Sequence, residues 1–515
     1  MPAAFQAVTV DYVAVAPMLI VVAGALVGVL VEAFAPRGRR HGIQVVLTLV
    51  VLVAALVVLA VWSRGHLAVT FGGSLSLDGV ALFLQGTLLA LSVLSVLVMA
   101  ERFGGVGSDA FTPMGASTPG SGQEDAATRA GYATSEVFPL TLFAVFGMMI
   151  FVSANDLITM FVGLEVLSLP LYVMTGLSRR RRLLSQEAAL KYFLLGAFSS
   201  AFFLFGSALL YGFAGSSDLK VIAQAISSTP GGLEGLLLPG VVLTLIGLLF
   251  KVGAVPFHSW TPDAYQGAPT PVTGFMAACT KLAAFGAILR LAYVGVGGDR
   301  WDWQIGVVVI AILTMVVGAV LSVTQTDVKR LLAYSSVAHA GFILVGVLAF
   351  SKAAVGGVMF YLVAYGATTI AAFAIVAMVR QDGSEASHLS QWAGLGRRHP
   401  VVAGSFAFLL LAFAGIPLTS GFTAKFATFA PAVASGTSGV VMVVVGVLAS
   451  AVTAFVYVRL IVLMYFTEPV EGVVALRASF GSKLAIGVGL AVTLLAGVAP
   501  TYVLQLAGNA SQFLL

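Results

Sequence analysis

Long apolar runs alternate with short polar segments along the whole chain, and this alternation is its dominant pattern. A helix that crosses the hydrocarbon core of a membrane needs about 20 predominantly apolar residues. Runs of this length predict about fourteen membrane-spanning helices in an all-α polytopic membrane protein. The expected spans are 12–34, 44–62, 79–100, 136–152, 157–177, 189–213, 238–257, 270–296, 303–324, 328–350, 353–379, 401–429, 440–466 and 484–504.

Two of these spans contain a Pro/Gly break beside a lysine. In the seventh span Lys251 is followed at once by Gly253 and Pro256, and in the twelfth a Gly-Ile-Pro sequence at 415–417 precedes Lys425. Proline interrupts the hydrogen bonds of a helix, and broken helices at corresponding positions are typical of transporters with inverted repeats. Because an odd number of spans separates the breaks, we expect helices four to eight and nine to thirteen to be inverted copies.

This pattern divides the chain into five expected parts. They are three N-terminal spans at 1–100, a polar cytoplasmic loop at 101–135, repeats at 136–296 and 297–467, and a C-terminal span at 468–515. The loop at 101–135 is rich in Gly, Ser, Thr and Pro, which is typical of a flexible and dispensable surface loop without catalytic residues.

Composition supports the membrane assignment. The 515 residues are 59% hydrophobic and only 9% charged, whereas soluble domains contain about 25% charged residues. The single cysteine, Cys279, excludes an internal disulfide and any iron–sulfur cluster or zinc finger built on cysteines of this chain.

The net charge of +5 reports topology and not nucleic-acid binding. Most arginines fall in the loops that alternate to one side of the predicted membrane, as the excess of positive charge in cytoplasmic loops requires. With this arrangement we expect both termini on the outer side of the membrane.

The candidate functional residues are charged side chains far from any loop. Lys251, Lys281 and Lys425 lie in apolar surroundings, and Glu165 is the acidic residue that lies in the middle of a span. A charge at membrane depth costs from a few to more than ten kcal/mol, so such residues are functional candidates. The alternatives are lysines that extend to the interface, and a protonated Glu165 hydrogen-bonded to another helix.

Three further residues belong to this candidate set with less support from the sequence. Lys191 follows Glu187 by four residues, so it forms either a surface ion pair or part of the path. His258 and His339 lie near the same spans, and each serves either as a proton relay or as a packing group.

Several stretches resemble the antiporter-like proton-channel subunits of respiratory complex I. They are LEVLSLPLYVMTGL, EAALKYFLLGAFSSAFFLFGSALLYG, FKVGAVPFHSWTPDAYQGAPTPVTGFMA, VKRLLAYSSVAHAGF and LAFAGIPLTSGFTAKF. The resemblance covers residues 136–466 and is closest to the N-type subunits of bacterial NADH:quinone oxidoreductase. Lys425 stands where M-type subunits carry a glutamate, and the chain stops soon after its last span, unlike the longer L-type subunits.

The resemblance implies a role for each candidate residue. Glu165 is the carboxylate paired with Lys251, Lys281 is the central relay, and Lys425 lies toward the outlet. Lys191, His258 and His339 match polar residues of the hydrated axis. Burial disfavours a charged ammonium and a nearby carboxylate favours it, so movement of Glu165 relative to Lys251 would switch the lysine between holding and releasing a proton.

The resemblance also implies partners and cofactors. The chain has no glycine-rich nucleotide motif, so we expect no cofactor or metal in it, and NADH, FMN, iron–sulfur clusters and quinone in other subunits. The expected partners are an M-like antiporter subunit, the small membrane subunits K, J and A, and lipid, with no nucleic acid. The alternatives are a subunit of a multi-subunit cation/proton antiporter or membrane-bound hydrogenase, and a structural membrane subunit with inert lysines.

Overall fold

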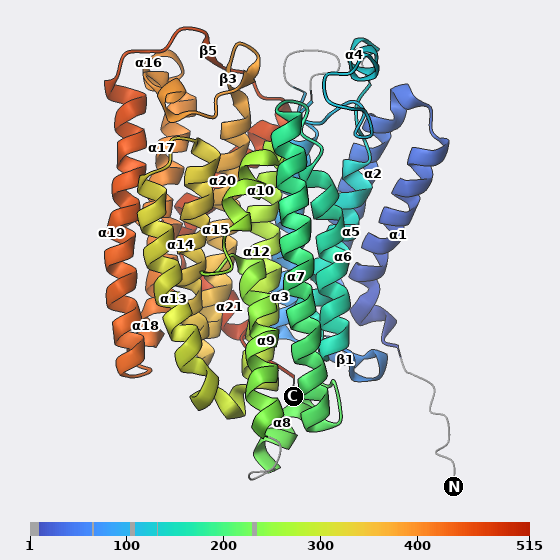
Figure 1. The fold of residues 1–515 in the computed structure, drawn as a ribbon, viewed down its shortest axis with the longest axis vertical. Coiled ribbons are helices and arrows are strands. Elements are labelled where there is room, and N and C mark those ends of the chain that lie inside the picture. The colour runs from blue at the N-terminus through green and yellow to red at the C-terminus, as the bar shows by residue number, and fades with distance from the viewer. Residues whose placement is uncertain (1–9, 64–65, 103–108, 131, 229–233, 515) are drawn as a thin grey trace.

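The helices of the protein run side by side along its long axis, as Figure 1 shows. The computed structural model describes residues 10–63, 66–102, 109–130, 132–228 and 234–514. Within these residues, twelve helices are long and apolar enough to cross a membrane. The prediction of an all-α polytopic membrane protein is confirmed.

The N-terminal part contains three long helices and a short hairpin. Its elements are α1 (Tyr12–Phe34), α2 (Arg37–Val61), β1 (Ala68–Thr70), η1 (Phe71–Gly73), β2 (Leu75–Leu77), α3 (Gly79–Met99) and α4 (Gly122–Arg129). Strands β1 and β2 pair antiparallel, with Ala68 opposite Leu77.

The next part contains the first broken helix. Its elements are α5 (Val137–Ser153), α6 (Leu157–Thr175), α7 (Arg182–Ala214), α8 (Leu219–Ser228), α9 (Glu234–Val252), α10 (Trp260–Gly267), α11 (Thr270–Phe275), η2 (Met276–Thr280), α12 (Lys281–Arg290), η3 (Leu291–Gly295) and η4 (Gly297–Asp299). The segments η2 and η3 are π-helical turns within one continuous span.

The last part contains the second broken helix and a small sheet. Its elements are α13 (Arg300–Val323), α14 (Val328–Val347), α15 (Lys352–Met378), β3 (Val379–Gln381), β4 (Ser384–Glu385), η5 (Leu389–Trp392), α16 (Leu395–Arg398), α17 (Pro400–Ala414), α18 (Ser420–Val433), α19 (Thr437–Phe466), β5 (Val473–Ala475), α20 (Phe480–Val498) and α21 (Thr501–Ala510). Strands β4, β3 and β5 form one antiparallel sheet in that order.

The predicted spans match these helices closely, except that two of them were predicted to begin several residues after the helix does. The helices α2 and α7 begin at Arg37 and Arg182, well before the predicted starts at 44 and 189. Apolar runs mark where a chain enters lipid, whereas backbone hydrogen bonding continues into the polar flank. Two further predicted spans correspond to the shorter apolar helices Val137–Ser153 and Pro400–Ala414, so the count of fourteen and the inverted repeats stay predictions.

Both predicted helix breaks are present. The helix α9 ends at Val252, and Gly253 then adopts a left-handed φ of 75° before α10 begins. The helix α17 ends at Ala414, where Gly415 has a φ of 82°, and α18 begins at Ser420. Glycine adopts this conformation without steric cost. Lys251 and Lys425 therefore each lie near an interruption in their span.

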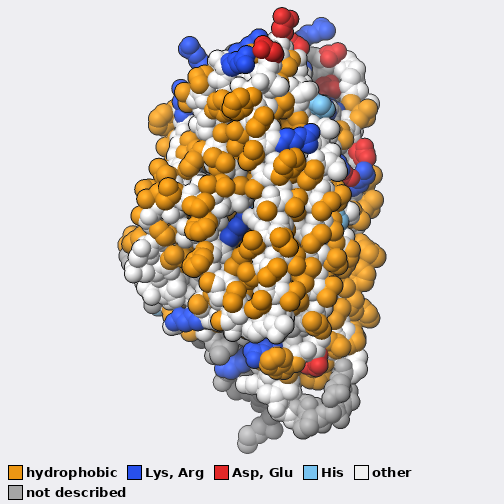
Figure 2. Space-filling view, turned by 90° about the vertical axis from the view of Figure 1, so that its left-hand side faces the viewer, with side chains coloured by type: hydrophobic (Ala, Val, Ile, Leu, Met, Phe, Trp, Pro, Cys, Tyr) orange, Lys and Arg blue, Asp and Glu red, His pale blue; other side chains and the backbone are white. Residues whose placement is uncertain are grey.

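The buried core and the apolar surface are on different helices. An 18-residue stretch within the span Thr270–Gly295 is buried throughout, and one within Lys352–Met378 is 94% buried, so these two helices form the centre of the bundle. The side of the molecule that faces the viewer in Figure 2 is covered mainly by hydrophobic side chains, with charged ones gathered at its top and a few farther down. This distribution suits a protein whose lateral surface contacts lipid.

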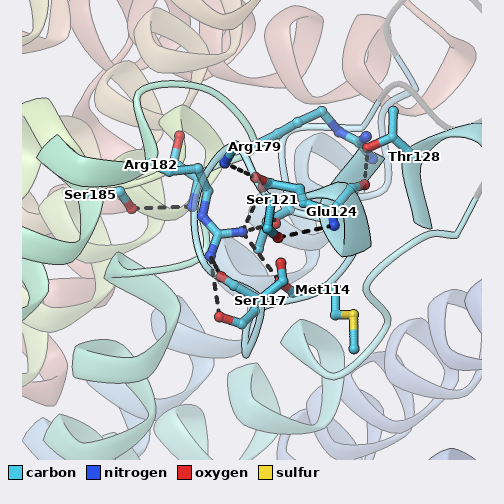
Figure 3. A network of polar contacts seen from close by, with 12 residues as sticks. Met114, Ser117, Ser121, Glu124, Thr128, Arg179, Arg182 and Ser185 are labelled. Atoms are coloured by element: carbon cyan, nitrogen blue, oxygen red, sulfur yellow. Dashed lines mark hydrogen bonds and ion pairs between the residues drawn. The ribbon is translucent and has the colours of Figure 1, made fainter. Parts of the chain in front are cut away.

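The segment expected to be a flexible, dispensable surface loop is partly buried in its described residues, and its dispensability stays a prediction. Arg182 at the start of α7 donates to Glu124 Oε1 at 2.9 Å, to the carbonyl oxygens of Met114, Gly115 and Ser117, and to the Thr112 hydroxyl (Figure 3). The composition suggested a loop, but one arginine has enough donors to hydrogen-bond several backbone carbonyls of this segment.

A second ion pair holds the same segment. Arg179 Nη2 donates to Asp109 Oδ1 at 2.6 Å, and the Asp109 side chain is only 1% exposed. Burial raises the pKa of the Asp109 carboxyl above its ordinary value, although the Arg179 guanidinium opposes this rise. The polar segment is thus attached to the connection between α6 and α7 at two points.

A fully buried ion pair joins α3 to α12 near the other end of the bundle. Arg290 Nη2 donates to both carboxylate oxygens of Asp78, at 2.9 and 2.8 Å, and both side chains are 0% exposed. Asp78 also accepts from the backbone of Ala81 as the N-cap of α3, and Leu514 N donates to it at 3.3 Å. One carboxylate therefore holds two helices and the C-terminal residues together.

Replacement of Arg182 by glutamine is expected to release the residues around α4. Removing one partner of a buried ion pair costs about 3–5 kcal/mol because the other charge stays buried. Hydrogen–deuterium exchange of residues 109–130 should become much faster in Arg182→Gln. The control is Arg180→Gln, which removes an exposed guanidinium two residues away; equal protection in both variants would show that Arg182 does not hold this segment.

Replacement of Asp78 by asparagine is expected to destabilise the protein strongly. Asparagine caps a helix about as well as aspartate, so the change isolates the loss of the buried charge pair, which costs about 3–5 kcal/mol. A lower melting temperature and less assembled protein in membranes should result. Asp11→Asn is the matched control, because Asp11 caps α1 but pairs only with the part-exposed His66; an equal effect of both changes would contradict the prediction.

Candidate functional site

Lys251 is held by neutral groups at the end of α9. Its side chain is buried, and Nζ donates to Ser168 Oγ at 2.7 Å and to the Tyr192 hydroxyl at 3.4 Å. The rings of Tyr172 and Tyr192 have centroids 5.6 and 5.3 Å from Nζ, within the range of cation–π attraction. This ammonium therefore has hydroxyl and aromatic partners from α6 and α7.

Glu165 approaches Lys251 without forming a direct ion pair. Residues Glu165, Ser168 and Tyr172 are spaced by three and four positions, so they share one face of α6. Within the described chain no ion pair of 4.0 Å or less joins Glu165 to Lys251, and the carboxylate oxygen Oε1 is buried without a hydrogen-bond partner there. The carboxylate still interacts with the ammonium at longer range, and Ser168 supplies the direct contact.

Lys281 is bound by α14 at the centre of the bundle. It begins α12 directly after the π-helical turn η2, a feature that is frequent at functional sites. Its Nζ donates to the carbonyl oxygen of Ser336 and, at 2.6 Å, to Ser336 Oγ. The Tyr365 ring centroid lies 5.5 Å from Nζ, and the Tyr265 hydroxyl lies 3.5 Å from Ser336 Oγ.

Lys425 lies at the second helix break, where it contacts the end of α17. Its Nζ donates to the carbonyl oxygens of Phe413 and Ala414, at 3.2 and 2.8 Å, and to Ser450 Oγ at 2.5 Å. These carbonyls end α17, where a helix has unpaired acceptors and partial negative charge. Lys425 also lines an apolar cavity of about 450 Å³ between α18 and α19.

His339 lies between Lys281 and Lys425. Its Nδ1 is 2.7 Å from the Tyr361 hydroxyl, and its Nε2 is buried without a hydrogen-bond partner among the described residues. The imidazole centroid is 5.0 Å from that of Tyr365 and 5.6 Å from that of Phe413. These rings contact Lys281 on one side and adjoin Lys425 on the other.

Lys251, Lys281 and Lys425 thus belong to one continuous series of contacts. From Lys251 the series continues through Tyr192, which stacks on Trp260 with centroids 4.5 Å apart, and through Tyr265, whose centroid is 6.4 Å from that of Trp260. Tyr265 reaches Ser336, which binds Lys281. Polar and aromatic side chains therefore connect the two helix breaks across the buried core.

Lys251, Lys281 and Lys425 each donate to one serine hydroxyl, and these serines were not predicted from the sequence. They are Ser168 for Lys251, Ser336 for Lys281 and Ser450 for Lys425. Serine is common in membrane helices and usually bonds its own backbone, so its type alone carries no signal. Ser168 could have been predicted, because it follows Glu165 by three residues and so lies on the same face of the helix.

The remaining two predicted residues lie outside this series. Lys191 is half-exposed and forms ion pairs with Glu187 at 2.7 Å and Asp263 at 3.1 Å, which is the surface arrangement that the sequence left open. His258 lies within the break between α9 and α10, with its ring 6.3 Å from that of Tyr334. Both assignments as relay residues stay predictions.

Comparison with known proteins shows which family of membrane proteins this chain is similar to. Residues 154–453 match the family described as NADH:quinone oxidoreductase/Mrp antiporter, TM. The chain is 54% identical to the protein named NADH-quinone oxidoreductase subunit N 3 of Streptomyces griseus, over 99% of this chain and 95% of that protein.

Solved structures show the same fold. A chain of respiratory complex I from Thermus thermophilus with bound aureothin is 32% identical, with a TM-score of 0.76 over 96% of this chain and 99% of that chain. A chain of the Mrp complex from Dietzia is 21% identical, with a TM-score of 0.80 over 97% of each chain, a similarity that concerns the fold alone.

The fold and the buried lysines define an antiporter-like subunit of a multi-subunit membrane complex. The chain belongs to the subunit N family of NADH-quinone oxidoreductase, respiratory complex I. Its established setting is therefore an enzyme complex that oxidises NADH and reduces quinone.

Loss of the Ser336 hydroxyl is expected to impair the site without unfolding it. A hydrogen bond to a charged group contributes about 1.5–3 kcal/mol, which corresponds to roughly tenfold or more in an equilibrium constant. We expect Ser336→Ala to lower NADH-driven proton pumping by roughly tenfold or more, while the complex still assembles to its normal level. In the control Ser207→Ala the lost hydroxyl bonds only its own helix, at the Phe203 carbonyl; equal pumping in the two variants would contradict the role of Ser336.

Proposed function

We propose that this chain is a non-redox, proton-translocating subunit of its complex, with Glu165, Lys251, Lys281 and Lys425 as the relay. The observation that carries the proposal is that Lys251, Lys281 and Lys425 are buried in the bundle and each is held by a serine hydroxyl. Charged side chains at membrane depth are costly and mark ion or proton pathways. Three of them joined by polar and aromatic contacts support a pathway along the core.

The hydroxyl partners suit a group that gains and loses a proton. A serine hydroxyl accepts a hydrogen bond from an ammonium and can rotate to donate one to a neutral amine. A carboxylate in direct contact would favour only the charged lysine. The relay therefore keeps hydrogen bonds in both protonation states of each lysine, which lowers the barrier to exchange.

Glu165 is the proposed switch. Its unpartnered oxygen and its separation from Lys251 describe a carboxylate that does not yet hold the ammonium directly. Movement of this carboxylate toward Lys251 would favour the protonated lysine, and movement away would favour release of the proton toward Lys281. Redox chemistry elsewhere in the complex would drive this movement.

The setting of the relay is part of the same proposal. NADH, FMN, iron–sulfur clusters and quinone are assigned to other subunits, and this chain would hold no cofactor or metal. Its direct partners would be an M-like antiporter subunit and small membrane subunits such as K, J and A, in a bacterial inner membrane with both termini outside. His339 is the best supported secondary relay, because it lies between Lys281 and Lys425.

The deciding experiment replaces Lys281 by alanine in the whole complex. NADH-driven proton pumping and quinone reduction should both fall severely, because an obligatory relay couples the two. The control is Lys352→Ala, which removes an exposed lysine at the start of α15 and should leave both activities unchanged. Unchanged pumping in an assembled Lys281→Ala complex would show that the lysine is structural, and pumping that requires added sodium would favour a cation antiporter.

A further inference from the structure

A small cavity rich in positive charge lies at the end of the bundle that carries the polar connections, at the top of Figure 1. Its volume is about 80 Å³, whereas a single buried water needs about 10–15 Å³. Its wall combines the connection between α6 and α7, the end of α10, the start of α14 and the β3–β4 hairpin. The space is therefore large enough for a small polar ion and is built from distant parts of the chain.

Cations outnumber carboxylates in the wall of this cavity. Five side chains are basic: Arg179, Arg180, Arg181, Lys329 and Arg380. Two are acidic, Asp109 and Glu385, so five minus two leaves a formal excess of three positive charges. A low-dielectric wall with one sign of charge concentrates ions of the opposite sign.

The two carboxylates already have partners within the wall. Asp109 accepts from Arg179 at 2.6 Å, and Glu385 accepts from the Thr270 hydroxyl at 2.7 Å and lies 4.0 Å from Lys329. They neutralise part of the charge and leave a net positive excess in the wall. The lysine itself is buried, and its Nζ donates to the Ala268 carbonyl at 2.7 Å.

The exposed arginines at the mouth have mainly neutral partners. Arg180 donates to the Ser384 hydroxyl at 3.2 Å, and Arg181 donates to the Ser387 hydroxyl at 2.6 Å and lies 4.0 Å from Asp327. A guanidinium presents several donors in a fixed plane that matches the oxygens of phosphate, and serine hydroxyls supplement it. The donors of the mouth and the buried lysine thus face one enclosed space.

We propose that this cavity binds a phosphate group, supplied either as a free phosphate ion or as the headgroup of an anionic phospholipid. The bound group would bridge the α6–α7 connection to the β3–β4 hairpin. It would thereby join the two predicted repeats at the same face where the residues around α4 are attached. The proposal does not depend on the relay, because none of the four proposed relay residues lines the cavity.

The test compares two variants of the intact complex. The first carries Arg180→Gln and Arg181→Gln, whose side chains are exposed, so the fold should be retained. The matched control carries Arg397→Gln and Arg398→Gln, an exposed arginine pair on α16 outside the cavity. Radiolabelled inorganic phosphate is measured on the detergent-purified complex, and bound phosphatidylglycerol is measured by native mass spectrometry after reconstitution in phosphatidylglycerol or phosphatidylcholine nanodiscs.

The expected result is a loss of about tenfold or more in retention of one of these probes in the 180/181 variant, with the 397/398 variant like the unmodified complex. If phosphate retention falls, the source is the free ion; if only phosphatidylglycerol retention falls, it is the lipid headgroup. Equal retention in both variants, or no retention by the unmodified complex, would overturn the proposal.

Discussion

The cost of a positive charge away from water is the constraint on which this structure depends. An isolated buried ammonium is strongly disfavoured, and Lys251, Lys281 and Lys425 are almost fully buried. Each is accommodated by oxygen acceptors and aromatic faces, and direct carboxylates are not among the partners described. The architecture around them, with its two helix breaks and its π-helical turn, places those acceptors within reach.

The two helix breaks satisfy their backbone groups in different ways. In the second break, the terminal carbonyls of α17 accept directly from Lys425, so the negative end of the helix holds the charge. In the first break, the carbonyl of Phe250 accepts from Trp260 Nε1 at 2.9 Å, and Lys251 turns instead to Ser168. The breaks are alike in the sequence, but they give their lysines different environments.

The sequence predicted the spans, the breaks and the buried lysines because each has a strong local signal. Apolar length marks a span, Gly253 and Gly415 mark the interruptions, and a lysine among apolar residues is conspicuous. The serines that bind the lysines and the Asp78–Arg290 pair could not be predicted, because they join residues far apart in the chain. The contacts of the residues around α4 were missed for the same reason, since Arg182 binds them from outside that segment.

The choice of neutral acceptors has a consequence for how charge is distributed along the axis. An opposite charge beside a lysine favours its protonated form, whereas a neutral hydroxyl can bond either form. Glu165 lies at the Lys251 end, and Lys425 lies beside a cavity at the other. In the proposed relay, a change of charge at Glu165 would therefore alter the proton occupancy of Lys251 first, and the serine hydroxyls would allow each following lysine to respond without losing its hydrogen bond.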